Sequence, residues 1–189
     1  MKKLLLTAIL ATVFVPIAFS QSEGPSLEDC GAWLHENTNY RSRSGDASTN
    51  YEKNTSDPNL AKLTYSHHKR NSGWIEEYTF RWSDIATVEI SYVYNKKLSL
   101  HYVKMKFVSK NNESLITRKH IASGNAIVGN SITNGSVIEK FSWFRTTVSA
   151  HPDQASATAT GNRFLKIAQR ILDLSTETKS GIDNSFFND

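Results

Sequence analysis

A series of strand-like segments between Leu60 and Thr147 constrains the fold of this chain more than any other feature. The segments are rich in Tyr, Phe, Trp, Val, Ile and Thr, which suit a pleated, half-buried surface, and polar stretches separate them. We interpret six of them as strands: 60–67, 74–82, 85–94, 98–109, 114–120 and 137–147. Because short connections join consecutive strands as hairpins, the pattern predicts an antiparallel sheet.

Alternation of apolar and polar residues is clearest in 88–94 and 98–102, and the polar segment 95–97 between them predicts a hairpin. After Tyr102 the alternation shifts by one position. The apolar residues that follow have the opposite parity: Val103, Met105 and Phe107. A β-bulge inserts one extra residue into a strand, so we predict a bulge within 98–109.

Two segments outside this region have helical periodicity. In 26–37, apolar residues recur at helical spacing, and Ser26 stands three residues before Asp29, as an N-cap does. In 163–174, an apolar stripe lies opposite a polar one. Its members are Phe164, Leu165, Ala168, Ile171 and Leu172. Such a stripe needs an apolar partner, so we expect the second helix to lie on the sheet.

The first twenty residues have the three-part pattern of a secretory signal peptide. Lys2 and Lys3 precede an apolar run of about a dozen residues, which is too short to span a bilayer. Ala18 and Ser20 then put small residues at the −3 and −1 positions of a cleavage site. We therefore expect a bacterial protein exported to the periplasm or the extracellular space, with no transmembrane span after cleavage.

The polar segments rich in Gly, Ser, Asn or Pro indicate loops at 39–59 and 121–136 and a linker at 151–160. The domain organisation that follows is a signal peptide at 1–20, an N-terminal helix and polar loop at 21–59, one β domain at 60–175, and a disordered tail at 176–189. The predicted fold class is mainly β (α+β). It is a bent antiparallel sheet or open barrel of about six or seven strands, with a short N-terminal helix and an amphipathic C-terminal helix.

This order of elements resembles that of pleckstrin-homology-like domains. The residues that carry the resemblance run from Glu76 to Ile85, from Leu98 to Phe107, and from Phe164 to Leu172. The resemblance covers about residues 60–175 and implies a bent sheet with a helix over one open end. It also implies binding of a lipid, peptide or protein without saying which, because one fold hosts many functions.

Charge and cysteine content narrow the range of partners. Cleavage would leave 20 basic against 18 acidic residues, a net charge of about +2, so we expect no nucleic-acid partner. Cys30 is the only cysteine and cannot form an internal disulfide. Its apolar helical neighbours predict a buried, inert thiol, and pairing with another chain is the alternative.

No motif for catalysis or for a cofactor occurs in the sequence. His67 and His68 are adjacent, as are Glu76 and Glu77, so on a strand the members of each pair point to opposite faces. Neither HExxH nor a nucleophile elbow nor a glycine-rich phosphate loop is present. We therefore assign no catalytic residue, no metal ligand and no cofactor.

The tip between the first two predicted strands is the candidate ligand contact, because Lys69 and Arg70 lie close to the aromatic ring of Trp74. The resemblance supports this choice, since pleckstrin-homology domains that bind anionic headgroups use cations in the equivalent hairpin. The sequence thus predicts an exported, non-catalytic binding or interaction module. Its partner would be an unknown protein or envelope component, and its oligomeric state stays open.

Two alternatives remain at this level. One is a hydrolase-type enzyme whose site is assembled from residues distant in sequence, using His67, His101 or His120. Convergence of several polar side chains in a concave pocket would favour it. The other is an envelope-associated structural subunit, which would expose a large apolar patch.

Overall fold

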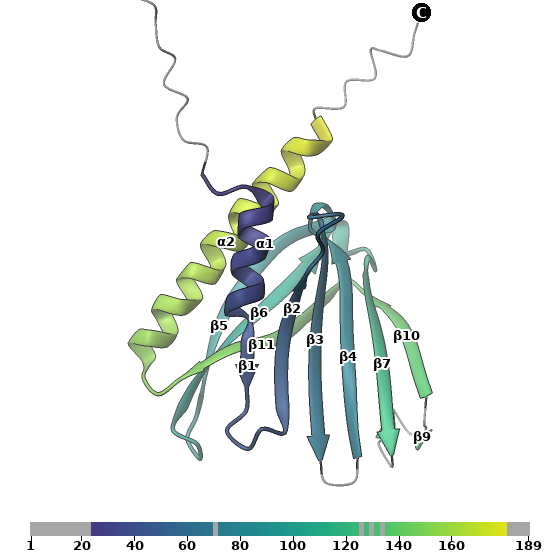
Figure 1. The fold of residues 1–189 in the computed structure, drawn as a ribbon, viewed down its shortest axis with the longest axis vertical. Coiled ribbons are helices and arrows are strands. Elements are labelled where there is room, and N and C mark those ends of the chain that lie inside the picture. The colour runs from purple at the N-terminus through teal and green to yellow at the C-terminus, as the bar shows by residue number, and fades with distance from the viewer. Residues whose placement is uncertain (1–23, 70–71, 125–126, 129–130, 133–134, 181–189) are drawn as a thin grey trace, which may run out of the picture.

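The computed structural model describes residues 24–69, 72–124, 127–128, 131–132 and 135–180. Over these residues the fold is mainly β, as the sequence predicts (Figure 1). Nine strands form two antiparallel sheets, neither of which closes into a barrel in the described part, and two helices pack beside them. The predicted signal peptide at 1–20 and the stretch 181–189 of the predicted tail lie outside the described residues.

The larger sheet has six strands and the smaller sheet has three. In spatial order the larger sheet consists of β1 (Asn39–Arg41), β2 (Ala47–Lys53), β3 (Leu60–Lys69), β4 (Ser72–Arg81), β7 (Ile116–Gly124) and β10 (Gly135–Phe141). The smaller sheet consists of β11 (Trp143–His151), β6 (Leu100–Ser109) and β5 (Ile85–Asn95). A short separate hairpin joins β8 (Ile127–Val128) to β9 (Ser131–Ile132).

The chain moves between the sheets at three corners. A 3-10 turn, η1 (Trp82–Asp84), leads from β4 to β5, and η2 (Lys110–Asn112) leads from β6 back to β7. The third corner is Ser142 alone, between β10 and β11, where its carbonyl oxygen accepts a hydrogen bond from the Ser109 amide at 2.8 Å. The single strand predicted at 137–147 is therefore wrong, because these residues form two strands in different sheets.

The loops predicted at 39–59 and 121–136 are also wrong. The first contains β1 and β2, and the second contains the end of β7, the β8–β9 hairpin and the start of β10. In β2, Ala47, Thr49 and Tyr51 are buried in alternation, while their neighbours face outward. Pairing with β3 stabilises this polar strand, whose own residues have low β-propensity.

The hairpin predicted at 95–97 is confirmed, but the bulge predicted within 98–109 is wrong. β6 pairs with β5 without interruption from Leu100 to Val108. The extra residues lie instead on the partner strands of β6: on β11 between Thr147 and Ser149, and on β5 between Ile85 and Thr87. Leu98 lies before the strand, in a turn where Ser99 has a φ of 51°. The parity of Leu98 therefore says nothing about the faces of β6.

Helix α1 (Leu27–Asn37) confirms the first predicted helix, and its N-terminus has the expected capping box. The Ser26 hydroxyl accepts a hydrogen bond from the Asp29 amide, and the Asp29 carboxylate accepts one from the Ser26 amide, both at 3.1 Å. Cys30 is fully buried on this helix, and burial raises the pKa of its thiol. The thiol is thus the inert core group that the sequence predicts.

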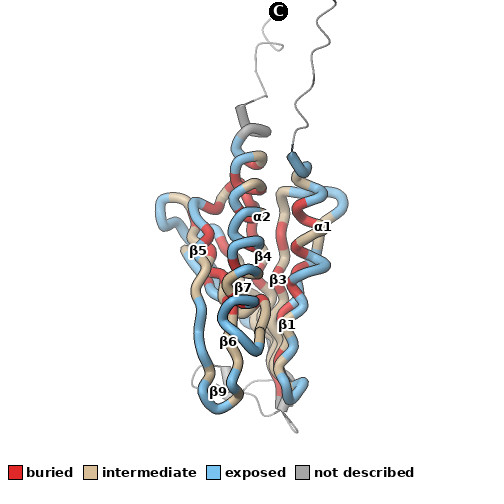
Figure 2. Tube along the Cα trace, turned by 90° about the vertical axis from the view of Figure 1, so that its left-hand side faces the viewer, coloured by how far each residue is buried: buried red, intermediate tan, exposed pale blue. Residues whose placement is uncertain are grey.

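Helix α2 (Gln154–Ser180) is much longer than the predicted 163–174, so the predicted linker at 151–160 and the tail from 176 to 180 are wrong in part. The Asp153 carboxylate accepts a hydrogen bond from the Ser156 amide at 2.8 Å at its start. Buried positions recur along the side that faces the sheets (Figure 2). Leu165 is not among them, because it is 39% exposed.

The core lies between the two sheets and the two helices. Aromatic side chains dominate its centre, where the rings of Phe80, Trp82, Phe107 and Phe144 contact one another. Helix α2 packs on β5, β6, β11 and α1. It approaches β5 closely at Gly161, where a Cβ atom would meet the Tyr92 hydroxyl at 2.5 Å. The helices thus cover one side of the molecule, whereas β7 and β10 extend away from them on the other (Figure 1).

Candidate ligand groove between the sheets

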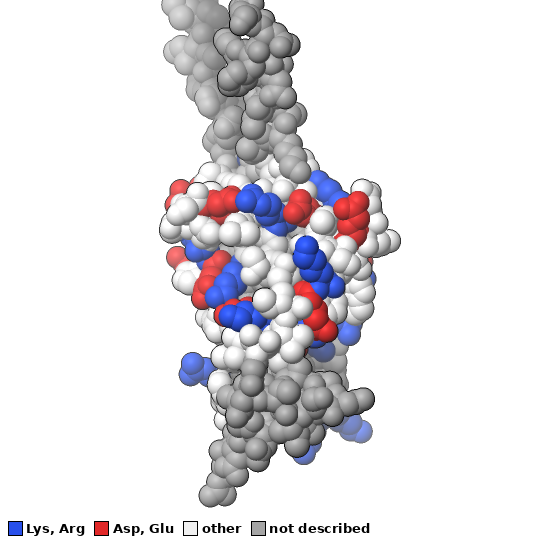
Figure 3. Space-filling model, turned by 90° about the vertical axis from the view of Figure 1, so that its right-hand side faces the viewer, with Lys and Arg blue, Asp and Glu red and all other residues white. Residues whose placement is uncertain are grey.

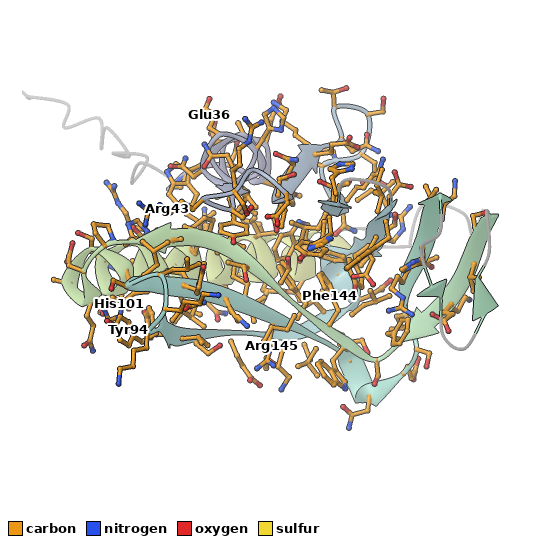
Figure 4. All side chains as sticks on the ribbon, turned by 90° about the horizontal axis from the view of Figure 1, so that it is seen from below. Glu36, Arg43, Tyr94, His101, Phe144 and Arg145 are labelled. Carbon is orange, nitrogen blue, oxygen red and sulfur yellow. The ribbon has the colours of Figure 1, made fainter. Side chains whose placement is uncertain are left out.

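The two sheets diverge from the corner at Ser142 and leave a groove between β11 and the inner face of the larger sheet. The groove has a volume of about 490 Å³. Its walls are Tyr78, Arg118, Phe141, Trp143, Phe144 and Arg145. Figure 4, a view from below, labels Phe144 and Arg145, which both belong to β11. These residues come from β4, β7, β10 and β11, so no single segment of sequence contains the groove.

Stacked aromatic rings form the rigid wall of the groove. The ring of Phe144 stacks on Tyr78 with 4.3 Å between centroids and on Phe107 with 4.7 Å, and both pairs are nearly parallel. Next along β11, Trp143 is 53% exposed at the rim. Stacking fixes the positions of these rings, which are almost completely buried: Tyr78 is 9% exposed and Phe144 is 4% exposed. They form a rigid base, and the accessible apolar surface of the groove comes from Trp143 and from the partly buried Phe141.

A charged cluster on β4, β7 and β10 lies beside this wall. The Glu76 carboxylate accepts a hydrogen bond from the Tyr78 hydroxyl at 2.9 Å, and it lies 3.4 Å from both Arg118 Nη1 and His120 Nδ1. Arg118 also pairs with Glu139, and its guanidinium carbon lies 4.6 Å from the centre of the Phe141 ring. The side of the molecule shown in Figure 3 accordingly has both signs of charge interspersed.

Strand register creates this cluster. Glu76 is directly opposite His120, and Tyr78 is directly opposite Arg118, in the β4–β7 pair. Glu77 points to the other face, where it pairs with Lys62 at 3.1 Å, so the prediction of opposite faces for Glu76 and Glu77 is confirmed. No local pattern in the sequence indicates this cluster, because Glu76 and Arg118 are 42 positions apart.

Two residues of the cluster have pKa values that are raised further above neutral pH. Burial and the neighbouring Glu76 carboxylate raise the pKa of Tyr78 to about 12. Burial alone would lower the pKa of Arg118, but hydrogen bonds with Glu139 and Tyr78 outweigh it and raise that pKa. Both groups therefore keep their protons throughout the physiological range and act as permanent hydrogen-bond donors.

Three buried nitrogens on this face have no hydrogen-bond partner among the described residues: Arg118 Nε, His120 Nε2 and His67 Nδ1. Buried polar atoms are normally satisfied, because leaving one unpaired costs about 1–3 kcal/mol. The inner face of the larger sheet thus retains unused capacity for hydrogen bonds close to the groove.

Of the three residues predicted to contact a ligand, Trp74 is described and is not among the residues that line this groove. Arg70 lies outside the described residues. Lys69 ends β3 opposite Ser72, and its side chain is likewise outside the description. Trp74 stacks on His67, its direct neighbour across the strands, with 4.1 Å between ring centroids. The predicted contact therefore stays a prediction for both cations.

The histidines are spread over the molecule. His35 bonds to the Tyr51 carbonyl oxygen at 2.7 Å, and His101 packs on the ring of Tyr94. Within the described residues, no group of three or more His, Cys, Asp or Glu side chains is placed to hold a metal ion. A second, more polar crevice of about 430 Å³ lies between the helices, β1 and β11, with Glu36, Arg41 and Arg163 among its walls.

No protein-family model matches this chain, and neither a curated protein nor a solved structure is significantly similar to it. None of the helices in the described part of the chain has the length and apolar character needed to cross a bilayer. The arguments about function therefore depend on the geometry of the groove.

Proposed function

We propose that this chain is an exported, non-catalytic binding module whose ligand lies in the groove between the sheets. The observation that carries the proposal is the aromatic wall formed by Tyr78, Phe141, Trp143 and Phe144 beside a charged cluster. Ligand sites in proteins are concave, largely apolar and supplied with a few placed polar groups. The groove has this combination, and its rings are held in position by stacking.

The state of the polar groups favours binding over acid–base catalysis. A general acid or base works best when its pKa is close to the working pH. Tyr78 and Arg118 are shifted the other way and keep their protons, so they suit a fixed set of donors. Glu76 already contacts Tyr78, Arg118 and His120, so its carboxylate oxygens are occupied within the cluster.

The Glu76–His120 contact is the one observation that favours the hydrolase alternative, since a carboxylate commonly orients a catalytic imidazole through Nδ1. In a working site, the other ring nitrogen must reach a nucleophile or water. His120 Nε2 is buried, and it has no hydrogen-bond partner among the described residues. Binding is therefore the better-supported function.

Titration with N-phenyl-1-naphthylamine, an uncharged aromatic fluorophore, tests the proposal. We expect saturable binding at one site, observed as enhanced probe fluorescence. Replacing Trp143 by Ser removes one wall at a position that is 53% exposed and should leave the fold intact. Because an aromatic contact contributes about 1 kcal/mol, affinity should fall roughly fivefold to tenfold.

The matched control is Tyr94→Ser, at an aromatic residue that is 54% exposed at the far end of β5. Figure 4 labels Tyr94 away from Phe144. This variant should bind the probe as the unmodified chain does. Equal affinities of the Trp143 and Tyr94 variants would refute the groove as the ligand site, provided that both keep the near-ultraviolet circular dichroism of the folded protein.

A further inference from the structure

We infer that the groove selects amphipathic anions: molecules with an apolar body and one acidic group. This inference rests on the proposed function, because it assigns a ligand class to the same groove. The apolar body would lie against the accessible rings of Phe141 and Trp143, and the acidic group would lie at Arg145 on the rim.

The charges around the groove are unequally compensated. Arg118 is neutralised by Glu76 and Glu139. Arg145 has no carboxylate within ion-pair distance in the described part of the chain. Its neighbour across the strands, Lys106, forms an ion pair with Glu89 at 3.1 Å. The rim therefore presents one uncompensated guanidinium, which favours an anionic ligand group.

A cationic ligand is disfavoured by the same arrangement. The carboxylates nearest the groove, Glu76 and Glu139, already accept from Arg118, and Glu76 also accepts from Tyr78. A bound cation would have to displace these contacts and would lie in the field of two arginines. An anion needs no such rearrangement.

The backbone of β11 adds donors beside Arg145. The Ser109 amide donates to the Ser142 carbonyl oxygen, which makes this a hydrogen-bonded pair of the β6–β11 ladder. Because bonded and non-bonded pairs alternate in an antiparallel ladder, Phe144 forms the next bonded pair with Phe107. The amides and carbonyls of Trp143 and Arg145 therefore both point to the free edge of β11, so two amide donors are available there beside the Arg145 guanidinium.

The test compares two probes that share one ring skeleton. 8-Anilinonaphthalene-1-sulfonate carries a sulfonate that N-phenyl-1-naphthylamine lacks, so the difference in their affinities isolates the contribution of the acidic group. We expect Arg145→Gln to weaken sulfonate binding about tenfold, as the loss of a charge-assisted contact does, and to change binding of the neutral probe less than about twofold. Raised salt should weaken only the sulfonate, by screening.

Arg43→Gln is the matched control, since Arg43 is an exposed arginine in the loop between β1 and β2, away from the groove (Figure 4). It should leave both affinities unchanged. Decanoate should displace the sulfonate probe, and 1-decanol should need a concentration about tenfold higher to displace it equally. That result would extend the ligand class to aliphatic acids.

Two failures can be told apart. If the sulfonate probe binds Arg145→Gln as tightly as the unmodified chain, or if 1-decanol competes as well as decanoate, the ligand class is wrong. Binding of the neutral probe would then still depend on Trp143, and the groove would stand as a site for uncharged ligands. If the neutral probe is also indifferent to Trp143→Ser, the proposed function itself fails. Unfolding temperatures of all variants, measured alongside, identify any variant whose binding is lost through misfolding.

Discussion

At the scale of single residues, the inner face of the larger sheet is where this protein departs from a simple apolar core. Tyr78 is buried on that face, and the half-buried Glu76 beside it contacts Tyr78, Arg118 and His120. Partly buried charges persist when each has a partner, because removing one partner leaves the other uncompensated. The cluster is therefore a unit in which a single substitution affects several groups.

The pKa of Tyr78 leads to a prediction about alkaline stability. Burial raises the pKa of this residue, and also that of Tyr40, from 10.0 to about 12 in the folded protein. A raised folded pKa contributes stability that is complete below about pH 10 and is lost as the pH rises through 12, since the unfolded chain releases its protons first. We expect the urea midpoint to fall steeply above pH 10.

Tyr78→Phe should make this fall shallower, and the double variant with Tyr40→Phe should make it shallower still. The measurement is urea unfolding at steps between pH 8 and pH 11.5. The loss of the hydrogen bond to Glu76 lowers stability at every pH and does not mimic the change in slope. An unchanged alkaline slope in both variants would contradict the assigned pKa values.

At the scale of elements, most of the apolar stripe predicted for helix α2 is buried in the core. Phe164, Ala168 and Ile171 are fully buried, at the spacing that places them on one stripe. Leu165 and Leu172 also belong to the predicted stripe. Leu172 is buried, at 8% exposure, whereas Leu165 is 39% exposed. The helix meets the curved smaller sheet along a contact narrower than the stripe, which leaves Leu165 at its edge.

These two leucines form a matched pair for mutation. Leu172→Asp places a carboxylate in an apolar contact and should lower the free energy of unfolding by about 3–5 kcal/mol. Leu165→Asp introduces the same side chain on the same helix at a largely exposed position and should cost about 1 kcal/mol or less. Chemical unfolding of the two variants provides the test, and similar losses would mean that the docking face of α2 is assigned wrongly.

At the scale of the whole molecule, segments from the two halves of the chain build one core. β5 and β6 lie between β4 and β7 in the sequence but belong to the smaller sheet. β11, which follows much later in the chain, completes that sheet. The buried hydroxyls of Thr49 and Thr146 come within 3.3 Å of each other, ninety-seven positions apart along the chain. Many stabilising contacts are thus long-range, which is typical of slowly folding β proteins.

At the same scale, the predicted export depends on residues 1–20, which the structure does not describe. Expressed in an exporting bacterial host, the protein should lose residues 1–20 and begin at Gln21. Intact-mass measurement of the secreted or periplasmic fraction provides the test. Ala18→Lys disrupts the −3 position and should leave the precursor uncut. A full-length species in the unmodified chain would contradict the signal peptide.

Local periodicity was sufficient to predict β5, α1 and the middle of α2, although only Ile85 and Val88 of β5 are buried. The alternation in β5, the capping box of α1 and the stripe of α2 all depend on neighbours within a few positions, so the residues themselves specify them. The buried Cys30 and the mainly β class follow from the same local information.

Only the tertiary structure decided which polar segments become strands and which distant residues meet. β2 is polar along its exposed face and is a strand because β3 and the facing smaller sheet bury Thr49 and Tyr51. The Glu76–Arg118–Glu139 contacts depend on the register of β4, β7 and β10, which no local pattern encodes. The groove exists because the chain turns at Ser142 and separates two sheets, a consequence of long-range packing rather than of local propensity.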